Sequence, residues 1–185
     1  MTMRGNFDRC LSFSLDEEGG FVSHPADPGG ATNHGVTQAV YDAARARWGL
    51  TPRTVRDIEM GEVQSIYQDR YWLAIHGDDL PAGVDLAVFD AAVNSGPGQA
   101  AKWLQRAVNA EAQARGRAQI ATDGAIGPKT IAAASKCDPR GLITSVCSQR
   151  LAMLKGLPTW GAFGKGWSGR VERVEAAAAG MIKGE

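Results

Sequence analysis

The sequence predicts a mostly α-helical protein with a small loop and hairpin region after its first helix. Three observations lead to this prediction: apolar residues recur at helical spacing, alternating strand patterns are scarce, and glycine and proline stand where helices would end or begin. The chain has 185 residues, of which 44% are hydrophobic, so it is long and apolar enough to bury a core.

The elements follow from the same signals in chain order. The first helix is expected over about residues 7–17, because Gly19 and Gly20 follow it as a glycine cap would. A loop rich in Gly and Pro covers 21–35 and has room for a short hairpin, after which Thr37 suits the N-cap of a helix to about residue 48. Later helices are expected where Pro or Gly punctuates a periodic run: one begins at Thr51-Pro52, and others cover about 62–76, 81–94, 99–110, 128–136, 139–155 and 168–182.

The clearest break in the chain is Gly96-Pro97-Gly98, which is the best candidate for a domain boundary. We expect a first part over 1–95 and a second, helical part over 96–185, packed either as two domains or as one globule. The charges divide at nearly the same place. Residues 1–99 hold 7 basic and 14 acidic groups, whereas residues 100–185 hold 13 basic and 6 acidic groups.

Composition excludes several classes of protein. The 20 Lys and Arg balance the 20 Asp and Glu, so we expect neither nucleic-acid binding through a global positive field nor binding to a membrane surface. No apolar run approaches the roughly 20 residues of a membrane span, and the first ten residues lack the apolar core of a signal peptide. The three cysteines and three histidines form no CxxC or HExxH pattern, so no metal and no cofactor are expected.

Glu18 is the first candidate catalytic residue, because it ends a helix whose apolar side points inward. It lies 11 residues after Phe7 and so returns to nearly the same helix face, with Leu11 and Leu15 toward that face. Partial desolvation there would raise the pKa of the carboxyl toward the value that a general acid needs. The alternative is an ordinary exposed glutamate at a helix end.

Asp27 is the second candidate, nine residues after Glu18 across a loop that has to double back. Glycosidases need two such groups on opposite sides of one bond, an acid for the leaving oxygen and a carboxylate that stabilises or activates the attacking species. Thr32 and Thr37 follow closely, and either hydroxyl is able to orient a water. The alternatives are an Asp that caps its own turn and, for Thr37, a helix N-cap.

These residues resemble the signature of glycoside hydrolase family 108. The family's Glu-Gly-Gly-aromatic motif is similar to Glu18-Gly19-Gly20-Phe21, and its Asp-Pro-Gly-Gly-x-Thr-x-x-Gly-Ile-Thr motif is similar to residues 27–37. Two later helix motifs of the family resemble residues 67–72 (YQDRYW) and 88–96 (VFDAAVNSG). The predicted peptidoglycan-binding module of the family resembles three further segments, at 103–105 (WLQ), 123–130 (DGAIGPKT) and 163–171 (FGKGWSGRV).

The resemblance implies a lysozyme-like helical fold and a phage-type N-acetylmuramidase, or endolysin. Such an enzyme hydrolyses the β-1,4 bond between N-acetylmuramic acid and N-acetylglucosamine in peptidoglycan. Glu18 matches the catalytic glutamate of the family, which we expect to be the general acid, and Asp27 matches the Asp of its second motif. Thr32 is preferred slightly over Thr37 as the catalytic threonine. Phe21 departs from the family's common Tyr at that position, so a hydroxyl is lost.

Substrate contacts are assigned to Thr37, Asn94 and Gln105 on the same resemblance, although Asn94 also suits a core-facing helix end. The tryptophans are expected to fill cores more often than to stack on sugars. Two rival functions remain: a lytic transglycosylase that cleaves the same bond without water, and a wall-binding protein without catalysis.

Peptidoglycan is the partner that the resemblance implies, and the protein is expected to be a monomer. Without a signal segment, the enzyme would accumulate in the host cytoplasm and reach the wall with the help of a holin. The basic second half is expected to attach to anionic peptidoglycan through charge, an attraction that salt weakens.

Overall fold

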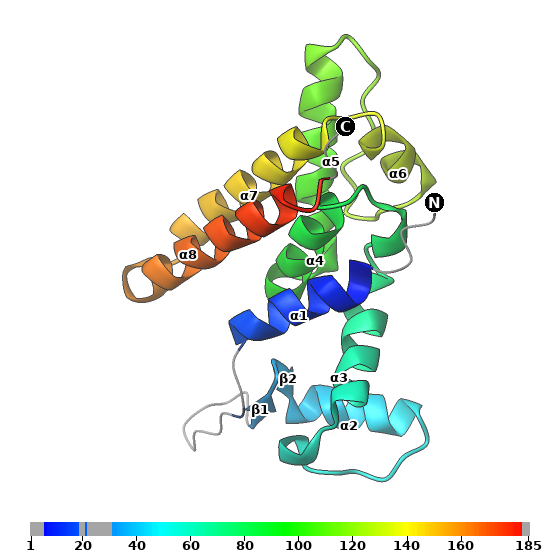
Figure 1. The fold of residues 1–185 in the computed structure, drawn as a ribbon, viewed down its shortest axis with the longest axis vertical. Coiled ribbons are helices and arrows are strands. Elements are labelled where there is room, and N and C mark those ends of the chain that lie inside the picture. Colours follow the sequence, from blue (N-terminus) through cyan, green and yellow to red (C-terminus); the bar gives the residue numbers. More distant parts are fainter. Residues whose placement is uncertain (1–5, 19–20, 22–30, 183–185) are drawn as a thin grey trace. The chain divides into compact units, whose positions relative to one another are not determined.

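The computed structural model describes residues 6–18, 21 and 31–182, which fold mostly into helices (Figure 1). The helices are α1 (Asn6–Glu18), α2 (Gln38–Arg47), α3 (Met60–Tyr67), α4 (Val84–Ser95), α5 (Pro97–Ala114), α6 (Pro128–Ala134), α7 (Pro139–Lys155) and α8 (Trp160–Ala179). The strands β1 (Thr32–Asn33) and β2 (Val36–Thr37) form an antiparallel hairpin, and η1 (Val55–Asp57), η2 (Gln68–Trp72) and η3 (Gly77–Asp79) are short helical turns. The mostly α-helical class and the hairpin after the first helix are therefore confirmed. No helix in the described ranges is long and apolar enough to span a bilayer.

Packing divides the chain into two compact units. The smaller unit comprises residues 11–70, and the larger unit comprises residues 1–10 together with 71–185. The helix α1 therefore contributes residues to both, and the turn at Gly96 lies inside the larger unit. The division into parts over 1–95 and 96–185 stays a prediction about domains, because packing units and sequence modules need not coincide.

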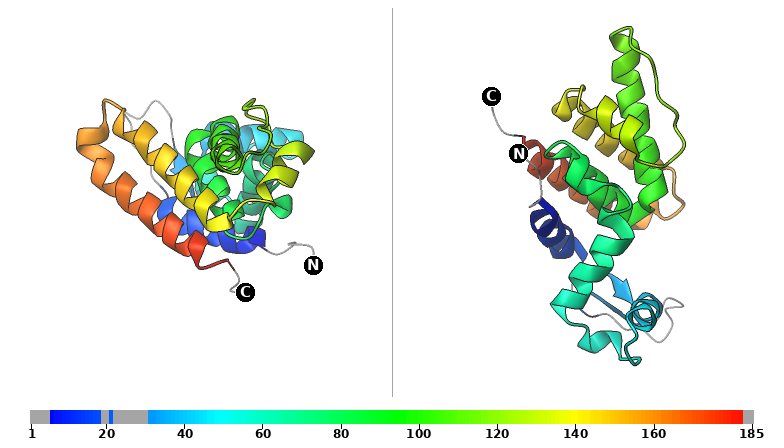
Figure 2. Two further views of the ribbon diagram at one scale, coloured as in Figure 1. Left: turned by 90° about the horizontal axis from the view of Figure 1, so that it is seen from above. Right: turned by 90° about the vertical axis from the view of Figure 1, so that its right-hand side faces the viewer.

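The larger unit is built around α4. Residues 84–92 of this helix are all buried, and α4 packs against α5, α7 and α8. The long helices α7 and α8 lie side by side in Figure 1 and in the left view of Figure 2. Inside this core the Asp90 carboxylate receives hydrogen bonds from Arg150 at 2.6 Å and from Arg170 at 2.8 Å. One buried carboxylate therefore joins α4 to both long helices.

Aromatic side chains fill the rest of this core. The rings of Phe7, Trp72 and Phe89 lie 5.4–6.1 Å apart, centroid to centroid, in tilted and edge-to-face arrangements. A Cβ on Gly77 would stand 2.6 Å or less from the Trp72 ring, so only glycine fits there. Trp72 and Trp103 are both at most 2% exposed, in agreement with the expectation that tryptophans fill cores.

The smaller unit contains α2, α3 and the hairpin, and a partly buried network of charges joins the two helices. Glu62 of α3 accepts hydrogen bonds from Arg45 at 2.6 Å, from the Tyr41 hydroxyl at 2.7 Å, and from Arg53. The hairpin is attached by Asn33, whose side-chain amide donates to the carbonyls of Val55 and Arg56.

The four largest differences from the predicted helix limits have identifiable causes or neighbours in the structure. No helix begins at Thr51-Pro52, because side chains of α2 hold this segment extended: Arg45 binds the Thr51 carbonyl and Gln38 binds the Arg53 carbonyl. The helix expected over 62–76 leaves α geometry at Tyr67 and continues as the π-helical turn η2, and α5 extends to residue 114.

The fourth difference is the start of α8, at Trp160 rather than at residue 168. The glycines of 161–169 disfavour a helix by local propensity, which is why the sequence predicts a later start. Packing outweighs that propensity, because Trp160 and Phe163 both lie against Trp167 with centroid distances of 6.2 and 5.7 Å. A Cβ on Gly164 would approach the Trp160 ring to 2.6 Å, so the glycine makes room for the indole.

Candidate active site

Glu18 is the last residue of α1, and its side chain is half-buried. It follows Leu11 and Ser14 at intervals of seven and four residues, and both of those side chains are buried. The three residues therefore share one face of the helix. This agrees with the sequence analysis, which set Glu18 at the border of the inward-facing side of the first helix.

The turn of the β1–β2 hairpin lies directly against the Glu18 carboxylate. His34 and Gly35 form this turn with φ values of 49° and 72°, the pattern of a type I′ two-residue turn. A Cβ on Gly35 would lie 3.3 Å from both Cγ and Oε2 of Glu18, and it would also collide with the Tyr67 hydroxyl. A glycine is therefore needed at position 35 for two reasons: the backbone φ is positive, and Glu18 and Tyr67 occupy the space that a Cβ would need.

Tyr67 of α3 holds the hairpin turn in its position beside Glu18. It is the last residue of α3, it is 2% exposed, and its hydroxyl donates a hydrogen bond of 3.0 Å to the His34 carbonyl. The phenol thus ties the hairpin turn to α3 beside the carboxylate. Sequence reasoning placed Tyr67 in a family motif but gave it no role, because nothing local to residue 67 indicates that it reaches residues 34 and 35.

The two candidate threonines face one another across the hairpin. Thr32 of β1 and Thr37 of β2 are register partners, so their side chains lie on the same face of the ribbon. Thr37 is also the N-cap of α2, where its hydroxyl accepts a hydrogen bond of 3.3 Å from the backbone N–H of Val40. The N-cap expected from sequence is confirmed for Thr37, whereas the Thr32 hydroxyl caps no helix in the part of the chain that the structure describes.

Asp27 lies outside the residues that the structure describes, so its distance from Glu18 stays a prediction. Phe21 is described: its ring is partly exposed and lies under the Arg56 guanidinium, which is 4.5 Å from the ring centroid. The ring that stands where the family commonly has a tyrosine is therefore held by a cation–π contact.

The two amides assigned to substrate binding have different surroundings. Gln105 is 1% exposed, and its side chain holds the loop before α6: it donates to Asp123 at 2.7 Å and to the Ala125 carbonyl at 3.0 Å, and it accepts from the Gly124 N–H at 3.0 Å. A sugar can reach Gln105 only if this loop moves. Because Gln105 binds residues 123–125, the family motif that begins at residue 123 has a structural role: it forms the loop that Gln105 holds.

Asn94 is exposed at the end of α4 and lines a surface pocket of about 460 Å³ in the larger unit. The pocket is also lined by Gln99, by Trp167, and by the apolar side chains of Met153 and Leu157. Two amides beside an indole suit a sugar with N-acetyl groups, since the amides can bond polar groups while the ring covers an apolar sugar face. Sequence reasoning did not select Gln99, which has no distinguishing neighbour in the chain.

The chemistry available around Glu18 is that of an acid–base group. The Glu18 carboxyl at a helix end lies against a glycine turn that the Tyr67 phenol holds, and the hairpin of that turn carries the Thr32 and Thr37 hydroxyls. Among the described residues no group of three His, Cys, Asp or Glu side chains is arranged to hold a metal ion. The arrangement is suited to proton transfer.

Comparisons with known proteins agree with this chemistry. The family model described as Glycosyl hydrolase 108 matches residues 11–96, and the model described as Predicted Peptidoglycan domain matches residues 99–172. The chain is similar to the solved structure of Brucella abortus SagA, with 41% sequence identity, a TM-score of 0.78, and coverage of 98% of both chains. No curated protein matches the sequence.

Proposed function

Because the chain belongs to the glycosyl hydrolase 108 family and carries a predicted peptidoglycan domain, it is a glycoside hydrolase of the cell wall, and we propose that it is an N-acetylmuramidase. The proposed reaction is hydrolysis of the β-1,4 bond between N-acetylmuramic acid and N-acetylglucosamine. Glu18 is the proposed general acid.

The position of the Glu18 carboxyl is the observation that supports this proposal. The carboxyl lies at the end of a helix, against a glycine that leaves it room, and the Tyr67 hydroxyl holds the adjoining turn. A general acid has to be fixed within hydrogen-bond reach of the leaving oxygen. The neighbouring exposed carboxylate Asp16 has no comparable surroundings, since it lies on the solvent side of the same helix.

The proposed mechanism transfers one proton from the enzyme to the leaving oxygen and one proton from the attacking water to the enzyme. The proton of the Glu18 carboxyl passes to the glycosidic oxygen while the bond from that oxygen to the anomeric carbon breaks. The ionised Asp27 accepts a proton from the attacking water, which Thr32 helps to orient; if Asp27 instead only stabilises the positive charge on the sugar ring, the Glu18 carboxylate left by the first step takes the proton of the water. The water oxygen forms the new bond to the anomeric carbon.

The pocket around Asn94 and Trp167 is the proposed contact for further sugars of the glycan strand. Replacing Asn94 by Ala is expected to raise KM for soluble glycan strands about fivefold with little change in kcat, since it deletes one hydrogen-bonding group that does not touch the reacting atoms. Gln113→Ala is the control, because it removes an exposed amide of α5 that lies outside the pocket.

The decisive experiment compares Glu18→Gln with Asp16→Asn. Each change neutralises one carboxylate of α1 while conserving its shape. Lysis of permeabilised bacteria, measured as a fall in turbidity, should decrease at least about a hundredfold for Glu18→Gln, a loss in the range found for general acid catalysts, and should stay near the parent rate for Asp16→Asn. Circular dichroism should report an unchanged fold for both.

The products separate the proposal from its rivals. Mass spectrometry of digested peptidoglycan should find hydrated reducing ends on N-acetylmuramic acid. Anhydromuramic ends would assign the enzyme to the transglycosylases instead. Lysis by Glu18→Gln within tenfold of the parent would remove Glu18 from the role of acid.

A further inference from the structure

A second pocket lies in the larger unit and shares no lining residue with the pocket of Asn94 and Trp167. It has a volume of about 360 Å³ and is formed by α5, by the loop that follows it, and by α6. The loop is held in place from α5, because Asn109 both donates to the Ile120 carbonyl and accepts from the Ile120 N–H, each at 2.8 Å. A pocket of this volume falls in the range of small-ligand sites.

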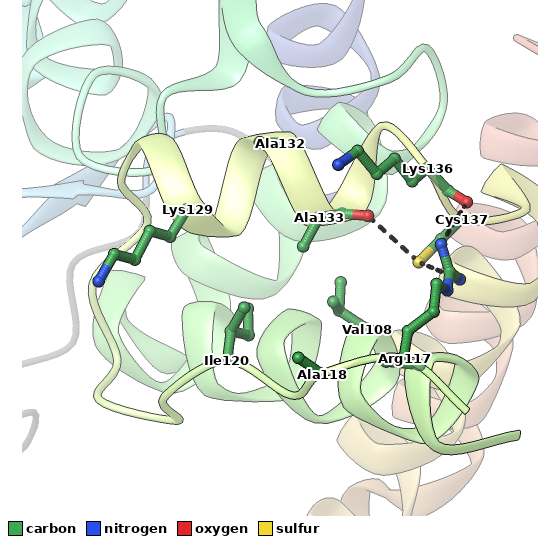
Figure 3. Close-up of a pocket in the computed structure, with 10 residues that line it drawn as sticks. Val108, Arg117, Ala118, Ile120, Lys129, Ala132, Ala133, Lys136 and Cys137 are labelled. Atoms are coloured by element: carbon green, nitrogen blue, oxygen red, sulfur yellow. Dashed lines mark hydrogen bonds between the residues drawn. The ribbon is translucent and has the colours of Figure 1, made fainter. Parts of the chain in front are cut away.

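Small apolar groups make up the floor of this pocket. Figure 3 shows Val108, Ala118 and Ile120 on one side and Ala133 of α6 on the other. Ala112 and Ala132 complete a lining in which methyl groups predominate. The indole and the side-chain amides that suit the first pocket for sugars do not line this one, so the two pockets differ in the chemistry they can recognise.

The rim of the pocket is positively charged. Lys129 stands at one end of α6, and Arg117 stands with Cys137 at the other end, beside Lys136 (Figure 3). No acidic residue lines the pocket. Glu111 forms an ion pair of 3.3 Å with Arg117, whereas the described carboxylates form none with Lys129 or Lys136.

We propose that this pocket binds the peptide stem of peptidoglycan, with the alanine methyl groups of the stem on the apolar floor and its carboxylates beside Lys129 and Lys136. This inference rests on the proposed function, since it assigns a second part of the same substrate. The stem is the component of peptidoglycan that carries free carboxylates on a short chain with methyl side groups. Cations at separated points of the rim match a ligand with more than one carboxylate.

The assignment gives the wall-binding half a specific task beyond general charge attraction. A glycan strand offers sugar faces and N-acetyl groups, which suit the pocket of Asn94 and Trp167. A stem peptide offers methyl groups and carboxylates, which suit this one. An enzyme with both pockets would prefer glycan strands that still carry their stems.

The test uses the full chain with the Glu18→Gln change, so that binding is measured without turnover. Three ligands are compared by sedimentation and calorimetry: intact sacculi, sacculi whose stems an amidase has removed, and a synthetic stem peptide that ends in D-alanine. Lys129→Ala/Lys136→Ala is the test variant. Arg140→Ala/Lys155→Ala is its control, because it deletes two exposed cations that line neither pocket.

The expected result has two parts. Intact sacculi should bind more tightly than stripped sacculi, and the test variant should bind the stem peptide about tenfold more weakly than the control variant does, as expected for two partly exposed ion pairs. Ala118→Phe, which narrows the pocket without a change of charge, should weaken binding of the stem peptide as well.

Three outcomes would overturn the inference. These are equal binding of intact and stripped sacculi, equal weakening by the two double variants, and a stem peptide that does not bind. Each of these leaves the Glu18 experiment untouched, because that experiment measures hydrolysis. Conversely, if the hydrolysis experiments contradict the muramidase assignment, binding of the stem peptide can still be measured and interpreted, because the binding test does not depend on turnover.

Discussion

Gly35 offers the sharpest test of how the hairpin turn supports Glu18. We predict that Gly35→Ala damages both stability and lysis, because the added methyl group would collide with the Tyr67 hydroxyl and would press on the Glu18 carboxylate from 3.3 Å. The matched control is Gly49→Ala. Gly49 has nearly the same φ, 71° against 72°, but a Cβ there meets no atom within 4 Å.

The size of the effect follows from two contributions. An alanine in the left-handed region costs about 1–2 kcal/mol, and both variants share this cost. Only Gly35→Ala also displaces the Tyr67 hydroxyl from the His34 carbonyl, and the loss of this partly buried hydrogen bond costs about another 0.5–1.5 kcal/mol. A misplaced catalytic carboxyl is expected to lower kcat by about 10- to 100-fold, again for Gly35→Ala alone.

Urea unfolding and the turbidity assay measure the two effects separately. Adding Tyr67→Phe to Gly35→Ala removes the oxygen that collides with the methyl group. The double variant should therefore be more stable than the sum of the two single changes predicts, by at least about 1 kcal/mol. If Gly35→Ala and Gly49→Ala lose the same stability and keep the same lysis rate, the contact between the turn and Glu18 contributes neither to stability nor to catalysis.

Three further predictions concern buried ionisable groups. Asp90→Asn should lower the free energy of unfolding by about 3–5 kcal/mol, because it removes the negative charge that pairs with the buried Arg150 guanidinium; chemical denaturation checks this. Burial opposes ionisation of Asp90, but the guanidinium groups of Arg150 and Arg170 outweigh it and lower the pKa. The stability that this shift contributes is therefore present above about pH 3.9 and is lost as the pH falls through the lower folded pKa, so the gap between parent and Asp90→Asn should shrink below about pH 4. Burial raises the pKa of the Cys147 thiol to about 12 and also raises that of Cys10, so mass spectrometry should find both thiols unmodified when the native protein is treated with iodoacetamide at pH 8, and modified in denaturant.

Local signals predicted most of the fold, because each needs only a few neighbouring residues. The threonine before α2 caps its backbone, and the prolines at the starts of α6 and α7 occupy the first helical turn, as expected. The prediction was wrong where distant side chains outweigh local propensity. At Thr51-Pro52, Arg45 holds the backbone extended, and at the start of α8 an aromatic cluster compensates for several glycines.

The sequence by itself determined the family, the order of the motifs and the choice of Glu18, because these depend on residue types at short spacings. Only the tertiary structure decided what the motif residues do. Asp90 and Gln105 hold buried elements together rather than facing an open surface, whereas Tyr67 and Gly35 lie at the candidate acid. The physical reason is that burial arises from contacts between residues far apart in the chain. The hydroxyl of Tyr67 meets the carbonyl of His34 across 33 residues, and Asp90 meets Arg170 across 80, so no periodicity within a single helix encodes either contact.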